Sequence, residues 1–577
     1  MKRYGKYIRP YWYAFILGPL LMLTEVAGEV LLPSFMADII NIGAANHDVG
    51  YIVQKGIIMI LTALIMMAGG VGGAWFASVA AINFGAGLRK DAFKKIQTFS
   101  FSEIDRFSTG SLVTRLTNDI TQVQNLIMMA LRMMLRAPGM LIGAIIMAFL
   151  MNRELAAVFL VILPVMTVAI ILLLRIAYPR FEFMQKKLDA LNSNIQEVLT
   201  NVRVIKSFVR EDYESARFEK SNAELKESSL NAFKIAIAQM PLMMLFMNLT
   251  TLVVVWLGGN QILDGKMQVG DLTAFTTYIV QVLMSLMMLA MVFLQSSRAF
   301  ASGRRINEVM DTQVSLTDDH AAYPEAVVKS GKIEFQNVSF RYYKDSAEKV
   351  LDQINLTIEP GQMIGIIGST GCGKTTLVSM IPRLYDVDEG KVLVDGIDVR
   401  DYSLNHLREG VGMVLQKNVL FSGTIEENLQ WGDENASKDQ IRKAAESAQA
   451  EGFIQKLADG YDTELGQGGV NVSGGQKQRL CIARALLKRP KILILDDSTS
   501  AVDTATEAKI REAFSTTLKE TTKLIIAQRI GSVMEADQIV VMDEGKIVGL
   551  GKHEDLLETC KAYQEIYDSQ MKKEVIA

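Results

Sequence analysis

The chain has 577 residues, too many for a single hydrophobic core, so its length predicts at least two domains. Its formal net charge of −3 argues against a general nucleic-acid-binding protein. The three cysteines lie far apart, which argues against a disulfide framework or a cysteine-rich metal site and fits the cytoplasm.

The N-terminal half contains six segments long and apolar enough to cross a bilayer, which takes about 20 residues each. The first lacks a signal-peptide cleavage site and continues through Glu25 and Glu29 into more apolar sequence, so we interpret it as a retained span. The six segments are residues 12–33, 53–80, 126–151, 156–176, 236–257 and 272–293.

Lysine and arginine placement predicts the topology of these spans. Basic residues are frequent before the first span, after the second and in residues 180–234, whereas residues 38–51 contain none. Because loops rich in Lys and Arg stay in the cytoplasm, we predict a cytoplasmic N-terminus and a cytoplasmic C-terminal domain after six crossings. The flanking basic residues are Lys2, Arg3, Lys6, Arg9, Arg89, Lys90, Lys94 and Lys95.

The two connections on that side, residues 83–124 and 178–233, are too long for simple loops and show helical periodicity. We expect the spans to continue as helices into the cytoplasm. Short coupling segments near residues 103–108 and 210–213 would lie at their tips and contact the C-terminal domain.

Four charged residues fall inside predicted spans, where charge is expensive. Glu25 and Glu29 are four residues apart, and Arg132 and Arg136 repeat that spacing, so each pair shares a helix face. Two interpretations stay open: a polar, cation-attracting cavity lining, or interfacial or inter-subunit ion pairing.

Methionines also repeat at helical spacing in the fifth and sixth spans. Methionine can re-pack around varied apolar ligands, so these stripes could line a drug site, or they could face other helices or lipid. The residues are Met240, Met243, Met244, Met247, Met284, Met287, Met288 and Met291.

The C-terminal half contains a phosphate-binding loop of the pattern G-x-x-x-x-G-K-[ST]. A buried strand precedes it and a helix pattern follows, so backbone N–H groups at a helix N-terminus are available to phosphates. Lys374 would reach the β- and γ-phosphates, and Thr375 would hold Mg²⁺. The loop residues are Gly368, Ser369, Thr370, Gly371, Cys372, Gly373, Lys374, Thr375 and Thr376.

Further motifs surround this loop in the sequence. Tyr342 precedes it, and Gln416 closes a strand at residues 412–415. Residues 471–476 read Asn-Val-Ser-Gly-Gly-Gln, and residues 492–496 form an apolar strand that ends in Asp496. Asp497, Ser500 to Asp503 and residues 525–528 complete the set, which resembles the ATP-binding domain of ABC transporters.

With six preceding spans, the chain resembles an ABC exporter half-transporter along essentially its whole length. The resemblance implies a multidomain protein, with a six-helix α transmembrane domain and a cytoplasmic α/β P-loop domain. We expect the transmembrane domain over residues 1–302, a polar linker over 303–328 and the ATP-binding domain over 329–577.

The resemblance also implies roles for single residues. Tyr342 would stack on adenine, and Thr375, Gln416 and Asp496 would surround Mg²⁺. The S-G-G-Q signature would contact the γ-phosphate of an ATP bound by an opposing subunit, so the active unit would be a dimer. Its residues are Ser473, Gly474, Gly475 and Gln476.

Two positions depart from the family pattern. Asp497 stands where the family has its catalytic glutamate, and Gln528 stands where it has a switch histidine. Aspartate is one methylene shorter, and an ångström-scale misplacement costs about 10²-fold. Loss of a γ-phosphate contact would cost about 10²-fold more, by analogy with removed oxyanion donors.

This pattern is similar to one subunit of the bacterial heterodimeric ABC exporters. It predicts an ATP-driven multidrug exporter of amphipathic compounds in the cytoplasmic membrane, with a degenerate ATP site here and a competent site in the partner half-transporter. The alternatives are a lipid flippase or peptide exporter, a homodimer in which Asp497 suffices as the base, and a mainly regulatory ATP-binding subunit.

Overall fold

The computed structural model describes residues 4–344, 347–498 and 502–574. It divides into two compact units, one of Met1–Gln97 with Gly110–Asp311 and the other of Thr98–Thr109 with Thr312–Ala577. Lys2, Arg3, Ser500 and Ala501, which the sequence analysis used, lie outside the described residues.

The first unit is all helical. Within its described residues, six helical segments are long and apolar enough to cross a membrane, which confirms the predicted number of spans. The segments are Gly5–Ala44, Val49–Gln97, Thr109–Met151, Arg153–Thr200, Glu211–Leu263 and Val269–Val292. The helices are α1 (Gly5–Ile8), α2 (Trp12–Asp38), α3 (Val49–Gln97), α5 (Thr109–Thr114), α6 (Ile120–Met133), α7 (Arg136–Met151), α8 (Arg153–Thr200), α9 (Val202–Ser207), α10 (Glu211–Leu263) and α11 (Val269–Asp311).

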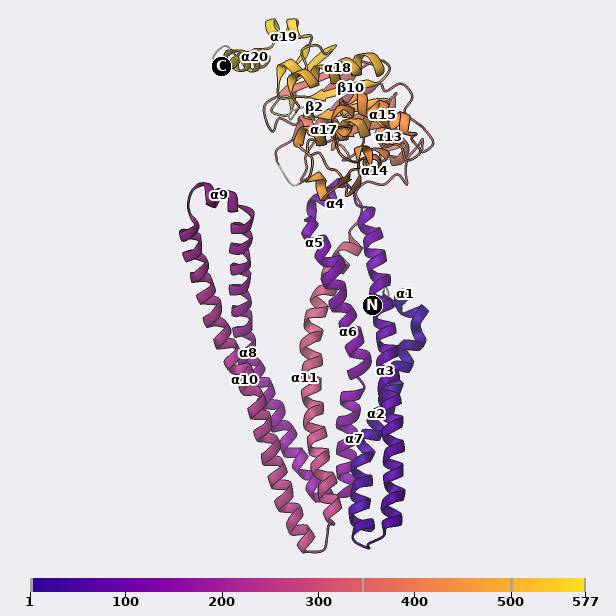
Figure 1. Cartoon of the computed structure of the whole chain (residues 1–577), viewed down its shortest axis with the longest axis vertical. Helices are drawn as coiled ribbons and strands as arrows, with labels where there is room; N and C mark the ends of the chain where they lie inside the picture. Colours follow the sequence, from indigo (N-terminus) through magenta and orange to yellow (C-terminus); the bar gives the residue numbers. More distant parts are fainter. Residues whose placement is uncertain (1–3, 345–346, 499–501, 575–577) are drawn as a thin grey trace. The chain divides into compact units, whose positions relative to one another are not determined.

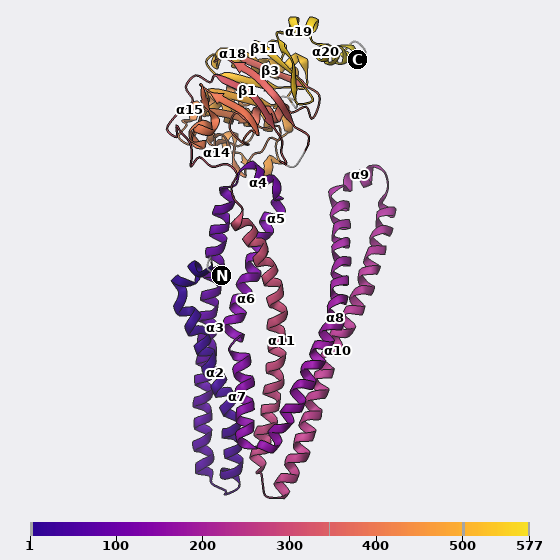
Figure 2. The ribbon, with the colours of Figure 1, turned by 180° about the vertical axis from the view of Figure 1, so that it is seen from behind.

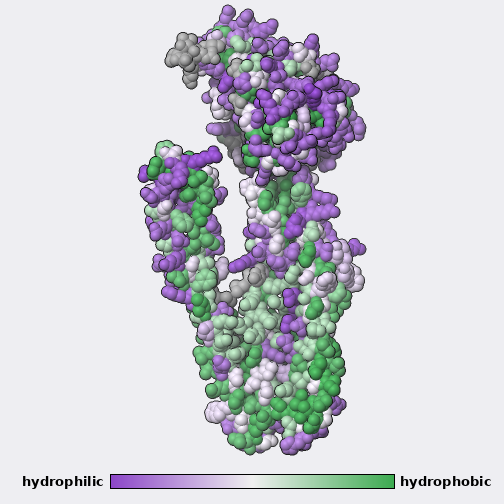
Figure 3. All heavy atoms as spheres, in the orientation of Figure 1, coloured by the Kyte–Doolittle hydropathy of each residue, from purple (hydrophilic) through white to green (hydrophobic). Residues whose placement is uncertain are grey.

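The helices of this unit form two groups. α8 and α10 run side by side and diverge from the other helices towards α9, as both ribbon views show (Figures 1 and 2). Hydrophobic residues gather at the end that carries the α2–α3 and α10–α11 connections, whereas polar residues are frequent near α9 (Figure 3). This distribution fits a span at one end and a water-exposed extension at the other.

α11 packs against α2 and α7 in the core of this unit. Tyr278 is fully buried, and its hydroxyl donates to the carbonyl of Val30 at 2.9 Å. Gln281 donates to the carbonyl of Glu29 at 2.8 Å. These bonds satisfy polar groups away from water, where an unpaired group costs several kcal/mol.

The third span is interrupted, which the sequence analysis did not anticipate. α6 ends at Met133 and α7 begins at Arg136. Pro138 lacks the N–H that would donate to the carbonyl of Met134, and its ring crowds that carbonyl. Proline therefore explains the interruption between the two helices.

The tip between α8 and α10 also differs from expectation. The short helix there is α9, and residues 210–213 instead begin α10. Phe208 and Val209, which connect the two, are 73% and 80% exposed.

The second unit is an α/β domain built on a mixed six-stranded sheet of order β12-β11-β3-β10-β9-β6. A four-stranded sheet of order β2-β1-β4-β5 and a small β7–β8 pair complete it. The strands are β1 (Ile333–Phe340), β2 (Leu351–Ile358), β3 (Met363–Gly368), β4 (Glu389–Val394), β5 (Ile397–Asp398), β6 (Val411–Val414), β7 (Gly423–Thr424), β8 (Glu464–Leu465), β9 (Ile492–Asp496), β10 (Thr522–Ile526), β11 (Gln538–Asp543) and β12 (Lys546–Gly551).

Helices cover this sheet and connect its strands. They are α12 (Lys374–Ser379), α13 (Leu404–Glu409), α14 (Ile425–Gln430), α15 (Lys438–Ser447), α16 (Glu451–Ile454), α17 (Gly474–Leu487), α18 (Thr504–Thr517), α19 (His553–Thr559) and α20 (Lys561–Glu574).

The five strands β11, β3, β10, β9 and β6 are parallel, and only the edge strand β12 of this sheet is antiparallel to its neighbour. Ile526 lies opposite Asp496 on one side and Ile366 on the other, so β3, β10 and β9 end at the same edge. In sheets of this kind ligands bind at the carboxyl edge of the strands. Buried apolar side chains fill these strands, which places the polar residues at that edge.

The short helix α4 (Phe101–Arg106) belongs to the second unit although it lies between two predicted spans. Ser100 and Glu103 form a capping box, and Glu103 also accepts from the backbone N–H of Ser315 at 3.1 Å. The hydroxyl of Tyr385 donates to Asp105 at 2.7 Å.

Candidate nucleotide-binding site

The phosphate loop lies at the carboxyl end of β3, and two of its glycines occupy positions where the backbone leaves no room for a side chain. Gly373 has φ +96°, and a Cβ there would lie 2.7 Å from the carbonyl oxygen of Val350. A Cβ on Gly368 would lie 2.1 Å from the carbonyl of Met542. Gly371 has φ +85° and open space beside it, so the loop can curve around a phosphate.

Lys374 begins α12 and lies across the loop. Its ammonium donates to the carbonyls of Gly368 at 2.9 Å and Ser369 at 2.7 Å. The sulfur of buried Cys372 is 3.7 Å from the same ammonium. A polyphosphate bound at this loop would therefore meet the positive charge of Lys374.

Asp496 ends β9 and is 1% exposed. One carboxylate oxygen accepts from the hydroxyl of Thr375 at 3.1 Å, and the other has no hydrogen-bond partner among the residues that the structure describes. Burial raises the pKa of the Asp496 carboxyl, although the bond from Thr375 works against this shift. An unpartnered buried carboxylate oxygen beside a threonine hydroxyl is the donor set that Mg²⁺ prefers. These residues therefore fit a magnesium ion.

Gln416 lies two residues beyond the end of β6, next to β9 in the sheet. Its side chain is exposed. The strand order thus brings three of the predicted metal-binding residues, Thr375, Gln416 and Asp496, to one edge.

The two positions that depart from the family pattern contact each other. Asp497 has φ +48°, in the left-handed region that aspartate tolerates better than most residues. Its carboxylate accepts from the side-chain amide of Gln528 at 2.7 Å. Asp497 is therefore oriented towards the neutral amide of Gln528, two residues beyond the end of β10, which can donate a hydrogen bond but cannot carry a positive charge.

Tyr342 is 44% exposed and lies beside the loop. Its hydroxyl and that of Thr376 are 2.9 Å apart. Its ring meets those of Phe340 and Tyr385 edge to face, with centroids 5.1 Å and 5.2 Å away. Edge contacts hold the orientation of the ring, and its partial exposure is compatible with stacking on a base.

The signature residues form the N-terminus of α17. Ser473 is the N-cap, and its hydroxyl accepts from the backbone N–H of Gln476 at 3.3 Å. The Gln476 side chain accepts from the backbone N–H of Ser473 at 2.8 Å, which completes a capping box. Gly474 and Gly475 lie in the first turn, where they leave the helix N-terminus open to an anion.

Sequence reasoning missed Tyr385 and Asp105. These two residues connect the aromatic cluster around Tyr342 to helix α4. They are 280 positions apart, and only the fold brings them together. Nothing in the local pattern at either position predicts this contact.

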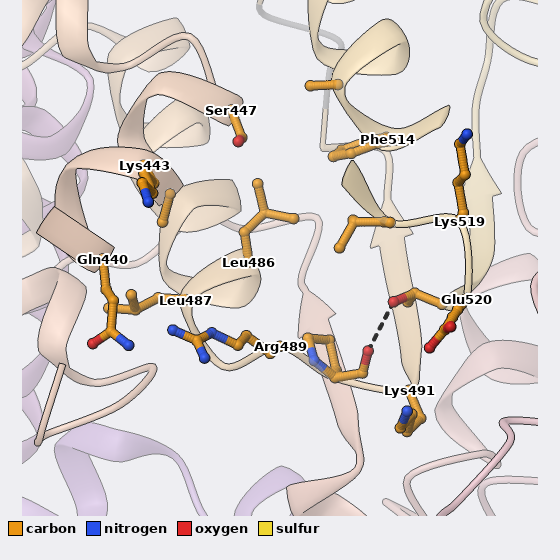
Figure 4. Close-up of a pocket in the computed structure, with 15 residues that line it drawn as sticks. Gln440, Lys443, Ser447, Leu486, Leu487, Arg489, Lys491, Phe514, Lys519 and Glu520 are labelled. Atoms are coloured by element: carbon orange, nitrogen blue, oxygen red, sulfur yellow. Dashed lines mark hydrogen bonds between the residues drawn. The ribbon is translucent and has the colours of Figure 1, made fainter. Parts of the chain in front are cut away.

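A separate cavity of about 720 Å³ lies at the C-terminal end of α17 (Figure 4). Leu486 and Phe514 form its apolar part, and Lys443, Arg489 and Lys519 lie around it. No residue of the phosphate loop lines it. It is distinct from the site described above.

Comparison with known proteins agrees with this geometry. The sequence matches the ABC transporter transmembrane region over residues 15–286 and the ABC transporter family over residues 351–500. It is 42% identical over 574 residues to the uncharacterized ABC transporter ATP-binding protein YfiB of Bacillus subtilis (strain 168), covering 100% of this chain and 99% of that protein. The chain belongs to the ABC transporter family.

Two further comparisons concern the kind of ABC transporter. The chain is 34% identical over 483 residues to the ATP-dependent lipid A-core flippase of Desulfotalea psychrophila (strain LSv54 / DSM 12343), covering 84% of each protein. Its fold matches the structure of a bacterial Atm1-family ABC exporter with ATP bound, with a TM-score of 0.79, 25% identity and 98% of each chain covered. This ABC transporter is therefore an exporter half-transporter, a multi-pass membrane protein with an ATP-hydrolysing domain, and the predicted fold class is confirmed.

Proposed function

We propose that this chain is one subunit of a heterodimeric ABC exporter that moves amphipathic compounds of the multidrug type out across a bacterial cytoplasmic membrane. Its own phosphate loop would bind ATP and hydrolyse it poorly. Its signature would complete the competent site of a second half-transporter. ATP binding would close the paired domains, and hydrolysis in the partner's site would reset them.

The hydrogen bond between Asp497 and Gln528 carries this proposal. A catalytic base must reach an attacking water from a fixed position, and here the carboxylate is one methylene short and engaged by an amide. Around it, Lys374 donates to the loop carbonyls and Thr375 donates to Asp496, which supports a role of these residues in binding. Binding without efficient hydrolysis follows from this combination.

Magnesium would be held by Thr375, Gln416 and Asp496 and would neutralise charge on the phosphates. The chain's residues would have separate tasks in this site. Tyr342 would orient the adenine ring, the loop N–H groups would hold the phosphates, and Asp497 would position the attacking water poorly. The exposed apolar residues at the α9 tip, Phe208 and Val209, support the need for a partner, since such residues mark contact surfaces.

The test is steady-state ATP hydrolysis by the purified chain, measured beside its binding of a non-hydrolysable ATP analogue. We expect tight binding with a turnover about 10²-fold or more below that of the complex with the partner half-transporter. Lys374→Ala serves as the control that assigns binding to this loop. Robust turnover by the chain alone, abolished by Asp497→Asn, would instead establish a homodimer.

A lipid flippase is the second candidate function. The observation that favours it is the 34% identity to proteins named as ATP-dependent lipid A-core flippases. Translocation of labelled lipids in proteoliposomes, compared with export of fluorescent amphipathic dyes by the same complex, separates the two functions.

A further inference from the structure

A charged cavity lies in the membrane-spanning unit, between α2, α3 and the interruption of the third span. Its volume is about 510 Å³, within the range of roughly 300–1,000 Å³ that small-ligand sites occupy. The residues that line it are Met22, Glu25, Ala63, Met66, Met67, Gly70, Val71, Ala74, Arg132 and Arg136. It therefore combines an apolar wall with three ionisable side chains.

Arg136 joins two acidic residues of α2, Glu25 and Glu29. Its guanidinium lies 3.1 Å from Glu25 and 3.3 Å from Glu29. One cation between two carboxylates leaves one negative charge in excess. Burying such a charge in a bilayer is costly unless another group compensates it.

Two groups at this cluster lack partners within the described part of the chain. The second carboxylate oxygen of Glu25 is buried and accepts no hydrogen bond there, and the Nε of Arg136 donates none. A Cβ on Gly70 would lie 3.0 Å from that Glu25 oxygen, so glycine at this position lets the carboxylate lie against α3. A buried acceptor without a donor is expensive, and a bound donor would satisfy it.

Arg132 supplies the opposite charge. It lies in the last turn of α6, directly before the interruption, and lines the same cavity, and the structure records no ion pair for it within the described ranges. The charges of the two glutamates and the two arginines sum to zero, but they are separated in space. Negative charge is in excess at Glu25, and the compensating cation is Arg132. A purely cationic ligand would face Arg132, and a purely anionic one would face Glu25.

We propose that this cavity binds the headgroup of a zwitterionic amphiphile. Arg132 would bind its phosphate or carboxylate, and the unpartnered oxygen of Glu25 would accept a hydrogen bond from its primary amine. Met22, Met66 and Met67 would contact its apolar portion, because methionine adapts to varied apolar shapes. This inference rests on the proposed export function and specifies its substrate class.

The test is binding to the full-length chain in nanodiscs, with and without the partner half-transporter. Three fluorescent short-chain probes with the same acyl chains are compared: phosphatidylethanolamine, phosphatidylglycerol and diacylglycerol. We expect phosphatidylethanolamine to bind most tightly. Glu25→Gln should weaken its binding about tenfold without weakening phosphatidylglycerol, whereas Arg132→Gln should weaken both about tenfold.

The matched control is Lys55→Gln. It breaks an ion pair of 2.7 Å with Asp38 that joins the same two helices away from the cavity, and all three affinities should stay unchanged. A soluble single-chain phosphoethanolamine that competes would identify free amphiphiles as ligands, and failure to compete would identify membrane lipid; both results support the headgroup site.

The proposal is overturned if Glu25→Gln and Arg132→Gln weaken all three probes equally, as a structural role would, or weaken none. Binding requires no ATP turnover, so this result is independent of the hydrolysis test above. Low hydrolysis without headgroup selectivity would contradict only the headgroup site. Headgroup selectivity in a chain that hydrolyses ATP alone would contradict only the heterodimer.

Discussion

On the proposed function, the phosphate loop and the signature helix of this chain would serve two different ATP sites, and the two places differ in which residues they hold. At the carboxyl edge of β3 and β9, the groups for binding are in place, but the catalytic position holds Asp497 on the amide of Gln528. At the N-terminus of α17, the capping box between Ser473 and Gln476 is complete.

On the proposed function, this contrast separates what ATP binding needs from what ATP hydrolysis needs. Binding needs backbone N–H groups, a lysine and a metal ligand, and a mispositioned base does not affect these groups. Hydrolysis needs a catalytic base that is positioned to within about 1 Å, and shortening the side chain by one methylene is enough to misplace it. A subunit can therefore lose turnover in its own site while it still supports turnover in its partner's site.

The largest expected effect is on ATP hydrolysis by the complex, where a change in the signature helix and a change beside the phosphate loop should differ. Ser473→Ala should lower ATP hydrolysis by the complex about 10²-fold, because it removes a γ-phosphate contact from the partner's site. Asp497→Asn should leave hydrolysis within about twofold, because that site contributes little turnover. Steady-state phosphate release measures both variants.

Ser437→Ala is the control for a lost helix cap. Ser437 and Gln440 form the same kind of capping box at α15, so its removal costs a similar amount of helix stability, about 1 kcal/mol. It should leave hydrolysis unchanged. A collapse of activity in Asp497→Asn would contradict the assignment of the two sites.

Restoring the family residues should produce the next largest effect. Asp497→Glu combined with Gln528→His should raise hydrolysis by the chain alone by about tenfold to 10²-fold, since the base gains reach and the γ-phosphate gains a donor. The left-handed backbone at position 497 suits aspartate better than glutamate, so a lower melting temperature should accompany this gain. Unchanged turnover in the double variant would place the defect elsewhere.

Adenine recognition should produce a smaller effect. Tyr342→Ala should weaken ATP binding about tenfold, because stacking on an aromatic ring contributes about 1–3 kcal/mol per base. Tyr342→Phe keeps the ring and loses only the contact with Thr376, so its effect should be about twofold. Binding of inorganic triphosphate, which has no base, should respond to neither change; equal losses for both ligands would mean that Tyr342 supports the loop rather than the base.

Much of this arrangement follows from local sequence. The six spans are long, mostly apolar runs, and the phosphate loop, Gln416 and Asp496 each stand at the end of a strand that the sequence marks. Because parallel strands end at one edge, the residues after them meet there. The hydrogen bond between Asp497 and Gln528 is a consequence of the β9–β10 pairing, although each departure was visible separately.

Other features depend on contacts that no local pattern encodes. The sequence could not identify the partner of Glu25. Glu25 and Glu29 are four residues apart, as are Arg132 and Arg136, and this spacing is compatible with ion pairs and with a cavity lining. Pro138 was a local signal for the interruption before Arg136. It was not decisive, because an apolar run of that length also fits one continuous helix. The tip helix α9 lies a few residues before the expected segment, since the polar run there fits either element.

The smallest expected effect concerns Tyr385, which links the Tyr342 cluster to α4. Tyr385→Phe removes the 2.7 Å hydrogen bond to Asp105 and should increase amide hydrogen exchange in α4 about threefold. Phe101→Ala, which removes only an edge contact with the Tyr385 ring, is the comparison variant on the same helix. If Tyr385→Phe left exchange in α4 unchanged, the hydroxyl would not anchor the helix.

The pH dependence of this contact can be stated in advance. Burial raises the pKa of Tyr385, and the hydrogen bond to Asp105 raises it further. A raised pKa means that the stabilising contact is fully present below the ordinary tyrosine pKa of about 10 and is lost only as the pH rises through the higher folded value. Protection of α4 should therefore be flat between about pH 6 and pH 9, and a decline within that window would point to another titrating group on α4.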